Sequence, residues 1–314
     1  MFFLGVACAI LAVVLADSLS NGDSRIALGI KASAIALVLS GVGQVGVELM
    51  LLEGRLVFFN ITRASVLMLP SVGIIVAFFT GLLSLVSAYV IMLAGQLIAV
   101  ALGCIFAMKN GRRSKSTKVP WDFSLKYWST SALDAIGGRG DQVALSALSQ
   151  ASTVGVYSLA VTCAAASAGL TEALNNLAYS RLTRLSGAES EEFLRRRSIL
   201  GVCCSLVSGA CIVIVVHFFG RSLFGPTFDG LTAVVIILVL AQTVGDQWSL
   251  RVLADSAKES ATTLIFASVA GLIVLATAIA LLATNAAITS ASMALAILLF
   301  SLTRLTIWTL AQKR

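Results

Sequence analysis

Long apolar runs separated by short polar loops dominate the chain from end to end. Each run is close to the roughly 20 residues that a helix needs to cross the hydrocarbon core of a bilayer. We predict about ten transmembrane helices, over residues 1–18, 26–47, 62–82, 85–108, 127–149, 153–178, 198–219, 230–250, 261–283 and 286–310. Because backbone groups in lipid must be hydrogen-bonded internally, and strand-type alternation is absent, the predicted fold class is all-α.

The third and fourth helices come from one apolar stretch, Ile61 to Met108, which is too long for a single helix. We place a tight turn near Thr80 and Gly81, since glycine readily adopts turn conformations. Pro70 lies within the third helix and predicts a kink, because proline cannot donate a backbone hydrogen bond.

Composition and charge indicate the same class of protein. Apolar residues make up 58% of the chain and charged residues only 12%, about half of the roughly 25% found in soluble domains. The net charge of +7 would suit a nucleic-acid binder. However, the basic residues lie in short loops between apolar runs, which is the topology signal of a membrane protein. We therefore expect no nucleic-acid partner.

The basic residues also predict the orientation. With the N-terminus in the cytoplasm, only Arg25 and Arg221 fall in outer loops. The cytoplasmic segments then hold Arg55, Arg63, Lys109, Arg112, Arg113, Lys115, Lys118, Lys126, Arg181, Arg184, Arg195, Arg196, Arg197, Arg251, Lys258, Lys313 and Arg314. By the positive-inside rule, this bias predicts a multi-pass membrane protein with both termini in the cytoplasm.

Two charged segments interrupt the apolar runs. The segment 109–126 is basic and contains Pro120, so we expect a cytoplasmic linker between an N-terminal four-helix bundle (1–108) and a C-terminal six-helix bundle (127–314). The segment 179–198 is amphipathic and is expected to lie along the inner membrane surface. Its arginines either meet anionic lipid headgroups or serve only as an inner anchor.

The fifth predicted helix carries charges at membrane depth, where a charge is costly and indicates function. At 100° per residue, Asp134 and Asp141 project about 20° apart, and Ser131 and Gly138 share their stripe. A face this polar points at a water-filled cavity or at another helix. Ion or proton coupling is the functional interpretation. Arg139 projects about 140° from Asp134, so it either contacts an anionic substrate or pairs with a neighbouring helix.

Polar residues in three other helices are further candidates for a site. Lys31 lies near the outer end of the second helix and either contacts substrate or extends to the membrane surface. Gln44 lies further along the same helix. Glu172 and Asn175 share a polar face near the inner end of the sixth helix, and Asp246 lies in the eighth. These last four either line a cavity or are interfacial residues near water.

No motif for catalysis or for a cofactor is present in the sequence. It has no Walker A segment, no glycine-rich nucleotide loop and no acid–base motif on a soluble domain. The six cysteines all lie in apolar runs, and none forms a Cys-x-x-Cys pair. We expect a protein that is not an enzyme and that holds no cofactor or metal ion.

Three stretches resemble a known family. The clearest extends from Trp128 to Leu182 and includes 154–160, VGVYSLA; the others are 224–228, FGPTF, and 53–63, which begins EGR. In these stretches the chain resembles the Wzx-type polysaccharide flippases of the multidrug/oligosaccharidyl-lipid/polysaccharide exporter superfamily. Members of the superfamily usually have two halves of about six helices each. The resemblance implies a MATE-like two-bundle architecture whose first half lacks two helices.

The resemblance also implies a function. Such a flippase moves an undecaprenyl-diphosphate-linked oligosaccharide across the inner membrane by alternating access, among membrane lipids and beside a glycan polymerase and other assembly proteins. A diphosphate needs a cation in a polar cavity, which Arg139 or Lys31 supplies in this interpretation. Coupling to a proton or sodium gradient needs a buried carboxylate, for which Asp134 or Asp141 is expected.

Three alternatives differ in what they predict. A cation-coupled multidrug antiporter predicts a cavity dominated by carboxylates without an essential cation. A membrane-embedded glycan polymerase or ligase predicts a large outer loop with catalytic arginines, whereas no outer loop here exceeds about a dozen residues. A non-transporting scaffold of a glycan-assembly complex is compatible with the two missing helices.

Overall fold

The computed structural model describes residues 2–19, 24–53, 55–111, 121–182, 185, 187–225, 228, 230–257, 262–285 and 287–312. In these residues the chain forms ten α-helices and no strand. The helices are α1 Phe2–Leu19, α2 Ser24–Leu52, α3 Leu56–Phe79, α4 Leu85–Gly111, α5 Trp121–Leu148, α6 Ala151–Leu182, α7 Gly187–Phe224, α8 Leu231–Ala257, α9 Thr262–Thr284 and α10 Ser290–Gln312. Parts of the predicted loops lie outside the described residues, including 112–120 of the linker, 183, 184 and 186 of the segment 179–198, and Pro226 and Thr227.

Most of these helices suit a membrane. Among the described residues, α2, α4, α6, α7, α8, α9 and α10 are long and apolar enough to cross one, and the two parts of a bent α3 add an eighth crossing if they count as one span. The chain is therefore an all-α, multi-pass membrane protein. Fewer helices than the predicted ten have the length and apolar character of a membrane span. The apolar part of α1 is short, and α5 carries a polar face. A polar face is expected where a helix lines a cavity instead of meeting lipid.

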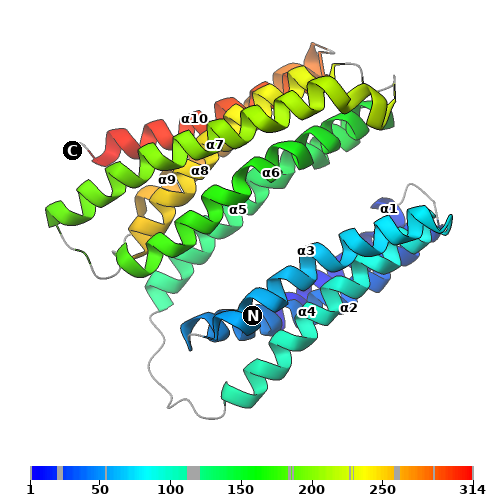
Figure 1. Ribbon diagram of the computed structural model, residues 1–314, viewed down its shortest axis with the longest axis horizontal. Helices are drawn as coiled ribbons and strands as arrows, with labels where there is room; N and C mark the ends of the chain where they lie inside the picture. The colour runs from blue at the N-terminus through cyan, green and yellow to red at the C-terminus, as the bar shows by residue number, and fades with distance from the viewer. Residues whose placement is uncertain are drawn as a thin grey trace. The chain divides into compact units, whose positions relative to one another are not determined.

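The chain forms two compact units, Met1–Thr117 and Lys118–Arg314. In the first unit, α2 packs against α1 and α4, and α3 packs against α4 (Figure 1). The contact of α2 with α4 depends on glycine, since a Cβ atom on Gly46 would overlap the carbonyl group of Gly103 and one on Gly103 would overlap that of Gly43. Small residues let helices approach closely in lipid, where packing drives their association.

The turn and the kink predicted around α3 are both present. Thr80 and Gly81 follow the end of α3, and Gly81 adopts a left-handed conformation with φ 70°, which glycine tolerates because it has no Cβ atom. Within α3, the parts Val57–Arg63 and Met68–Phe79 are inclined by 41°. The bend comes just before Pro70, whose ring clashes with the carbonyl group one turn earlier.

In the second unit, α8 is the central helix. It packs against α6, α7 and α10, while α9 packs against α10 and α5 (Figure 1). In the apolar stretch of α8, 56% of the residues are buried, against 17–33% in the other six helices of membrane length. The core joins Leu145 of α5, Tyr157 of α6, Val235 of α8 and Met293 of α10, all fully buried. Polar groups on α8 are therefore well shielded from lipid.

The segment 179–198 differs from its prediction. In the described residues it forms no separate element, because α6 and α7 both extend into it and α7 is one helix from Gly187 to Phe224. At 38 residues, α7 is about 57 Å long and exceeds the roughly 30 Å hydrocarbon core. An ion pair at helical spacing, Arg196 Nε to Glu192 Oε1 at 2.6 Å, supports the extension.

Candidate functional site

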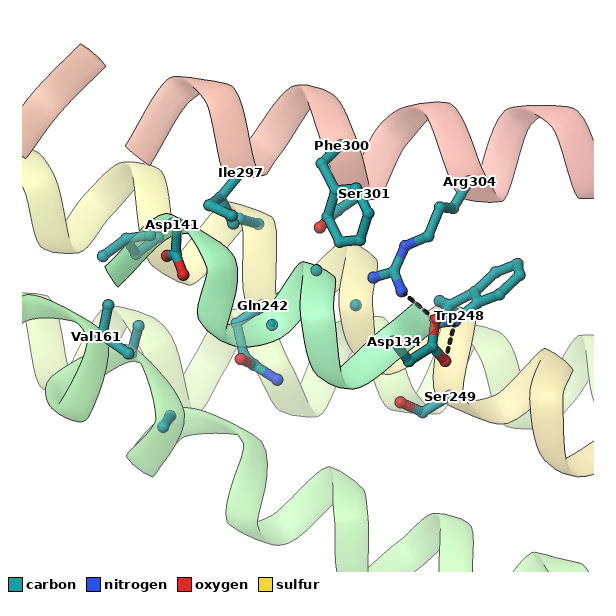
Figure 2. A pocket seen from close by; sticks show the side chains of 17 residues that line it. Asp134, Asp141, Val161, Gln242, Trp248, Ser249, Ile297, Phe300, Ser301 and Arg304 are labelled. Carbon is teal, nitrogen blue, oxygen red and sulfur yellow. Dashed lines mark hydrogen bonds and ion pairs between the residues drawn. The ribbon is translucent and has the colours of Figure 1, made fainter. Parts of the chain in front are cut away.

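A cavity of about 300 Å³ lies within the second unit, lined by α5, α6, α8 and α10 (Figure 2). Its lining residues with charged, amide or hydroxyl groups are Asp134, Asp141, Gln242, Ser249, Ser301 and Arg304. Apolar and small residues, including two glycines of α5, form the rest of the wall. Charged groups are rare within membrane helices, because each one costs a few kcal/mol to insert.

An ion pair between α5 and α10 is the main charged feature of this cavity. Arg304 is 7% exposed, and its Nη1 donates to Asp134 Oδ1 at 2.8 Å. Trp248 Nε1 donates to Asp134 Oδ2 at 3.0 Å, and Ser268 Oγ donates to Oδ1 at 3.0 Å. Figure 2 shows the Arg304 and Trp248 bonds converging on the carboxylate. One aspartate thereby connects α5 to α8, α9 and α10.

Aromatic rings and glycines position the Arg304 guanidinium. Its central carbon lies 4.0 Å from the Phe300 ring centroid and 5.0 Å from that of Trp248, within the range of cation–π attraction. A Cβ atom on Gly271 would lie 2.6 Å from Arg304 Cγ, and one on Gly137 would overlap the Phe300 ring. Glycines of α9 and α5 therefore make room for two large side chains of α10.

The second carboxyl group of α5 has a different environment. Asp141 is 4% exposed, and the hydroxyl group of fully buried Tyr157 donates to its Oδ2. The Oδ1 atom of Asp141 is buried without a hydrogen-bond partner in the described part of the chain. Asp134 thus accepts from three side-chain donors, one of them charged, whereas the one side-chain donor to Asp141 among the described residues is a neutral hydroxyl group.

A second cavity, of about 320 Å³, shares lining residues with the first. The shared residues are Asp134, Gln242 and Ser249. Three further polar residues line the second cavity but not the first: Glu172 and Asn175 of α6 and Asp246 of α8. Among the residues that line the two cavities, four are acidic and one, Arg304, is basic. The lining therefore suits cations and protons better than small anions.

Asp246 is held by neutral donors. It is buried, and it accepts hydrogen bonds from Ser205 Oγ of α7 and, at 2.9 Å, from Gln242 Nε2 of its own helix. Asn175 Nδ2 donates to the backbone carbonyl group of Asp246 at 3.4 Å. These bonds connect α6, α7 and α8 beside the second cavity.

Three of the predicted site residues do not line either cavity. Arg139 is exposed, and its Nη1 contacts Gln142 Oε1 on the same helix at 3.4 Å. Lys31 belongs to the first unit, where its Nζ pairs with Asp17 Oδ1 of α1 at 2.9 Å. Gln44 belongs to the same unit and is exposed on α2. The other five predicted residues line the cavities as described above.

Two residues central to the site, Arg304 and Trp248, are missing from the sequence-based prediction. Arg304 lies inside the tenth apolar run, and a basic residue at that depth is itself a signal of function. Nothing local identifies its partner, which is 170 residues away in the chain. Trp248 lies near the end of its apolar run, where tryptophan is usually an interfacial residue.

The chemistry of this arrangement is that of binding and charge movement. Carboxyl groups take up protons or cations, and a guanidinium group binds phosphate or carboxylate oxygens. Intramembrane ionisable groups that face a cavity commonly mark ion and substrate pathways. Comparisons of the chain with protein-family models, with curated proteins and with solved structures find no match.

Proposed function

We propose that this chain is a membrane transporter that moves an undecaprenyl-diphosphate-linked oligosaccharide across the inner membrane by alternating access, driven by a proton or cation gradient. The observation that carries the proposal is the Asp134–Arg304 ion pair beside a cavity within apolar helices. Desolvating two charges is costly, so such a pair is weak support for stability and stronger support for function. The proposal includes no enzymatic step.

Arg304 is the cation that the proposed substrate needs. A diphosphate binds well to a guanidinium group, which can donate two parallel hydrogen bonds. The Nη1 of Arg304 is bonded to Asp134, while its buried Nε has no hydrogen-bond partner in the described residues. Because Arg304 lines the cavity, we assign to it the role that the sequence-based interpretation gives to Arg139 or Lys31. The lipid tail would remain in the bilayer.

The acidic lining favours a second candidate function, the antiport of small cationic compounds against protons. Four acidic residues line the cavities, and the one basic residue is paired with Asp134. Organic cations also bind aromatic faces, which Trp248 and Phe300 supply. This function does not need Arg304 as an anion-binding group, and that difference separates the two candidates.

The proposal includes an orientation and an architecture. The loop bias in basic residues supports cytoplasmic termini, and units of four and six helices are compatible with a MATE-like two-bundle transporter. As the resemblance implies, glycan polymerase and other assembly proteins would be partners. A reporter fused after Arg314 tests the orientation: activity is expected from a cytoplasmic reporter, and activity from a periplasmic one would contradict it.

Reconstitution into liposomes tests the substrate class. The vesicles contain an undecaprenyl-diphosphate disaccharide with a fluorescent dye on the sugar, and an impermeant reductant bleaches the dye in the outer leaflet. We expect an imposed pH gradient to shift the lipid between leaflets with the protein present, and not in protein-free vesicles. Ethidium, a cationic dye, is the second probe. Movement of ethidium without movement of the lipid would overturn the proposal in favour of the antiporter, and movement of neither would favour a scaffold.

A further inference from the structure

The proposed function needs a residue that binds and releases the coupling ion. We propose that Asp141 is this residue and that its ion is a proton, that the Tyr157 hydroxyl group positions it, and that Asp134 remains the fixed anionic partner of Arg304. The role in transport rests on the proposed function, whereas proton binding at Asp141 is measured independently of transport.

Asp134 is poorly suited to carry a proton in this conformation. Its Oδ1 accepts from Arg304 and Ser268, and its Oδ2 accepts from Trp248. A proton on either Asp134 oxygen would point at an N–H or O–H group that already donates to that oxygen, so the two hydrogens would repel. It would also leave the Arg304 charge without its counterion, and an unpaired buried charge is strongly unfavourable.

Asp141 has the opposite environment. The Tyr157 hydroxyl group donates to Oδ2, while Oδ1 is buried with no partner in the described residues. A carboxylate in such a place has lost most of its water, and no charged side chain bonds to it in return. A neutral carboxylic acid carries a much smaller penalty than a carboxylate. The geometry therefore favours a protonated Asp141, with the proton on Oδ1, in the conformation described.

The charged groups around Asp141 do not offset its burial. From α6 the facing titratable group is Tyr157, and from α10 it is Arg304, which bonds to Asp134. The residues of α8 that line this cavity are uncharged, and α9 contributes none to the lining. On α5 itself, Arg139 is two residues away but exposed, and its guanidinium contacts Gln142.

The first cavity provides a path for the proton. Its volume of about 300 Å³ leaves room for several waters, since one water occupies about 30 Å³ in the liquid. Figure 2 shows Asp141 at one end of the labelled residues and Asp134 with Arg304 at the other, with Gln242 between them. When the Asp141 carboxyl group turns toward the cavity that it lines, a hydronium ion in the cavity water loses one O–H bond as the Oδ1–H bond of Asp141 forms. The reverse transfer returns the proton to water.

Proton release from Asp141 would change the charge balance around the ion pair. The two aspartates are seven residues apart, about 10 Å along α5. With Asp141 neutral, the charges of Asp134 and Arg304 cancel within the first cavity. With Asp141 ionised, a second carboxylate is left without a counterion and competes for Arg304. An unneutralised charge favours a conformation that admits water, so proton release is coupled to opening.

Infrared spectroscopy of the full chain in lipid membranes tests proton binding directly. A protonated carboxylic acid in apolar surroundings has a carbonyl stretch that a carboxylate lacks. Asp246 is also a buried carboxyl group bonded by neutral donors, so the measurements use a protein that carries Asp246→Asn. In this background we expect pH-difference spectra to show such a band, Asp141→Asn to remove it, and the matched Asp134→Asn to leave it. Tyr157→Phe should shift its frequency, because the acid loses a hydrogen-bond donor. Asp141→Glu keeps an acid and should retain a shifted band, which guards against misfolding of the asparagine variant.

The outcomes separate this assignment from the proposed function. A band that persists in Asp141→Asn, that disappears in Asp134→Asn, or that is absent from the Asp246→Asn background protein would overturn the assignment. In the liposome assay, Asp141→Asn should move the lipid equally fast with and without a pH gradient. If the unmodified protein moves no lipid but the infrared results hold, the proposed function fails and the proton site stands.

Discussion

Replacing Arg304 with glutamine is expected to lower the free energy of unfolding by about 3 kcal/mol, because it leaves the Asp134 carboxylate without its counterion. Arg304 is buried and the Asp134 side chain is 27% exposed, and removing one charge of such a pair is more damaging than removing both. The double variant Asp134→Asn, Arg304→Gln should therefore recover part of the loss. Unfolding of the purified protein in mixed detergent micelles, followed by circular dichroism, measures these differences.

The matched control for this prediction is Arg139→Gln. It is the same substitution in the same unit, but Arg139 is exposed and contacts only a glutamine among the bonds described. It should change the free energy of unfolding by no more than about 0.5 kcal/mol. In the liposome assay, Arg304→Gln should abolish lipid movement, while Arg139→Gln should retain it. Equal effects of the two substitutions on unfolding would show that the Arg304 pair has no special structural role.

The second large effect on stability is expected from substituting one of two adjacent glycines of α5. Gly137→Ala is expected to destabilise the protein by about 1–3 kcal/mol, because its Cβ atom would overlap the Phe300 ring and force that ring to move. Phe300 packs on the Arg304 guanidinium, so its displacement also disturbs the ion pair. The same unfolding measurement applies, and lipid movement in liposomes should slow in parallel.

Gly138→Ala is the control, because a Cβ atom at Gly138 would meet nothing within 4 Å. Alanine is a better helix former than glycine by about 1 kcal/mol, so this substitution should be neutral or stabilising. The same substitution at two neighbouring glycines is thus expected to lower the free energy of unfolding at Gly137 and not at Gly138. Destabilisation by both, or by neither, would mean that Phe300 does not occupy the space assigned to it.

The features that depend on local sequence were predictable, and those that depend on distant partners were not. Apolar length predicts the helices, and the Thr80–Gly81 turn and the bend before Pro70 follow from residues in place. Helical spacing also predicts that Asp134 and Asp141 share a face, and both line one cavity. In each case the physical cause lies within a few residues of the feature.

Helical periodicity cannot identify the side chains of other helices that pair with the Asp134–Asp141 face of α5. Helix geometry shows that Arg139 does not pair with Asp134 on their own helix, but it cannot show which distant side chain does. That side chain is Arg304, and its approach depends on the small size of Gly271, a packing relation across two helices. The continuous α7 is a second example. Its charged start resembles a surface segment in sequence, whereas Leu194 is buried against Leu250 and other residues of a small core.

The most direct test of the whole account is whether the Asp134–Asp141 face of α5 lines a water-filled cavity. Single cysteines are introduced at Gly138, Gln242 and Ser301, which line the cavity, in a protein whose six native cysteines are replaced. Ile136 and Val143, which are 58% and 66% exposed on the outside of the helical unit, are the controls. In membranes, the three cavity positions are expected to react with a water-soluble maleimide, and the two apolar controls are expected not to react. Reaction at Ile136 and Val143 with none at the cavity positions would contradict the account.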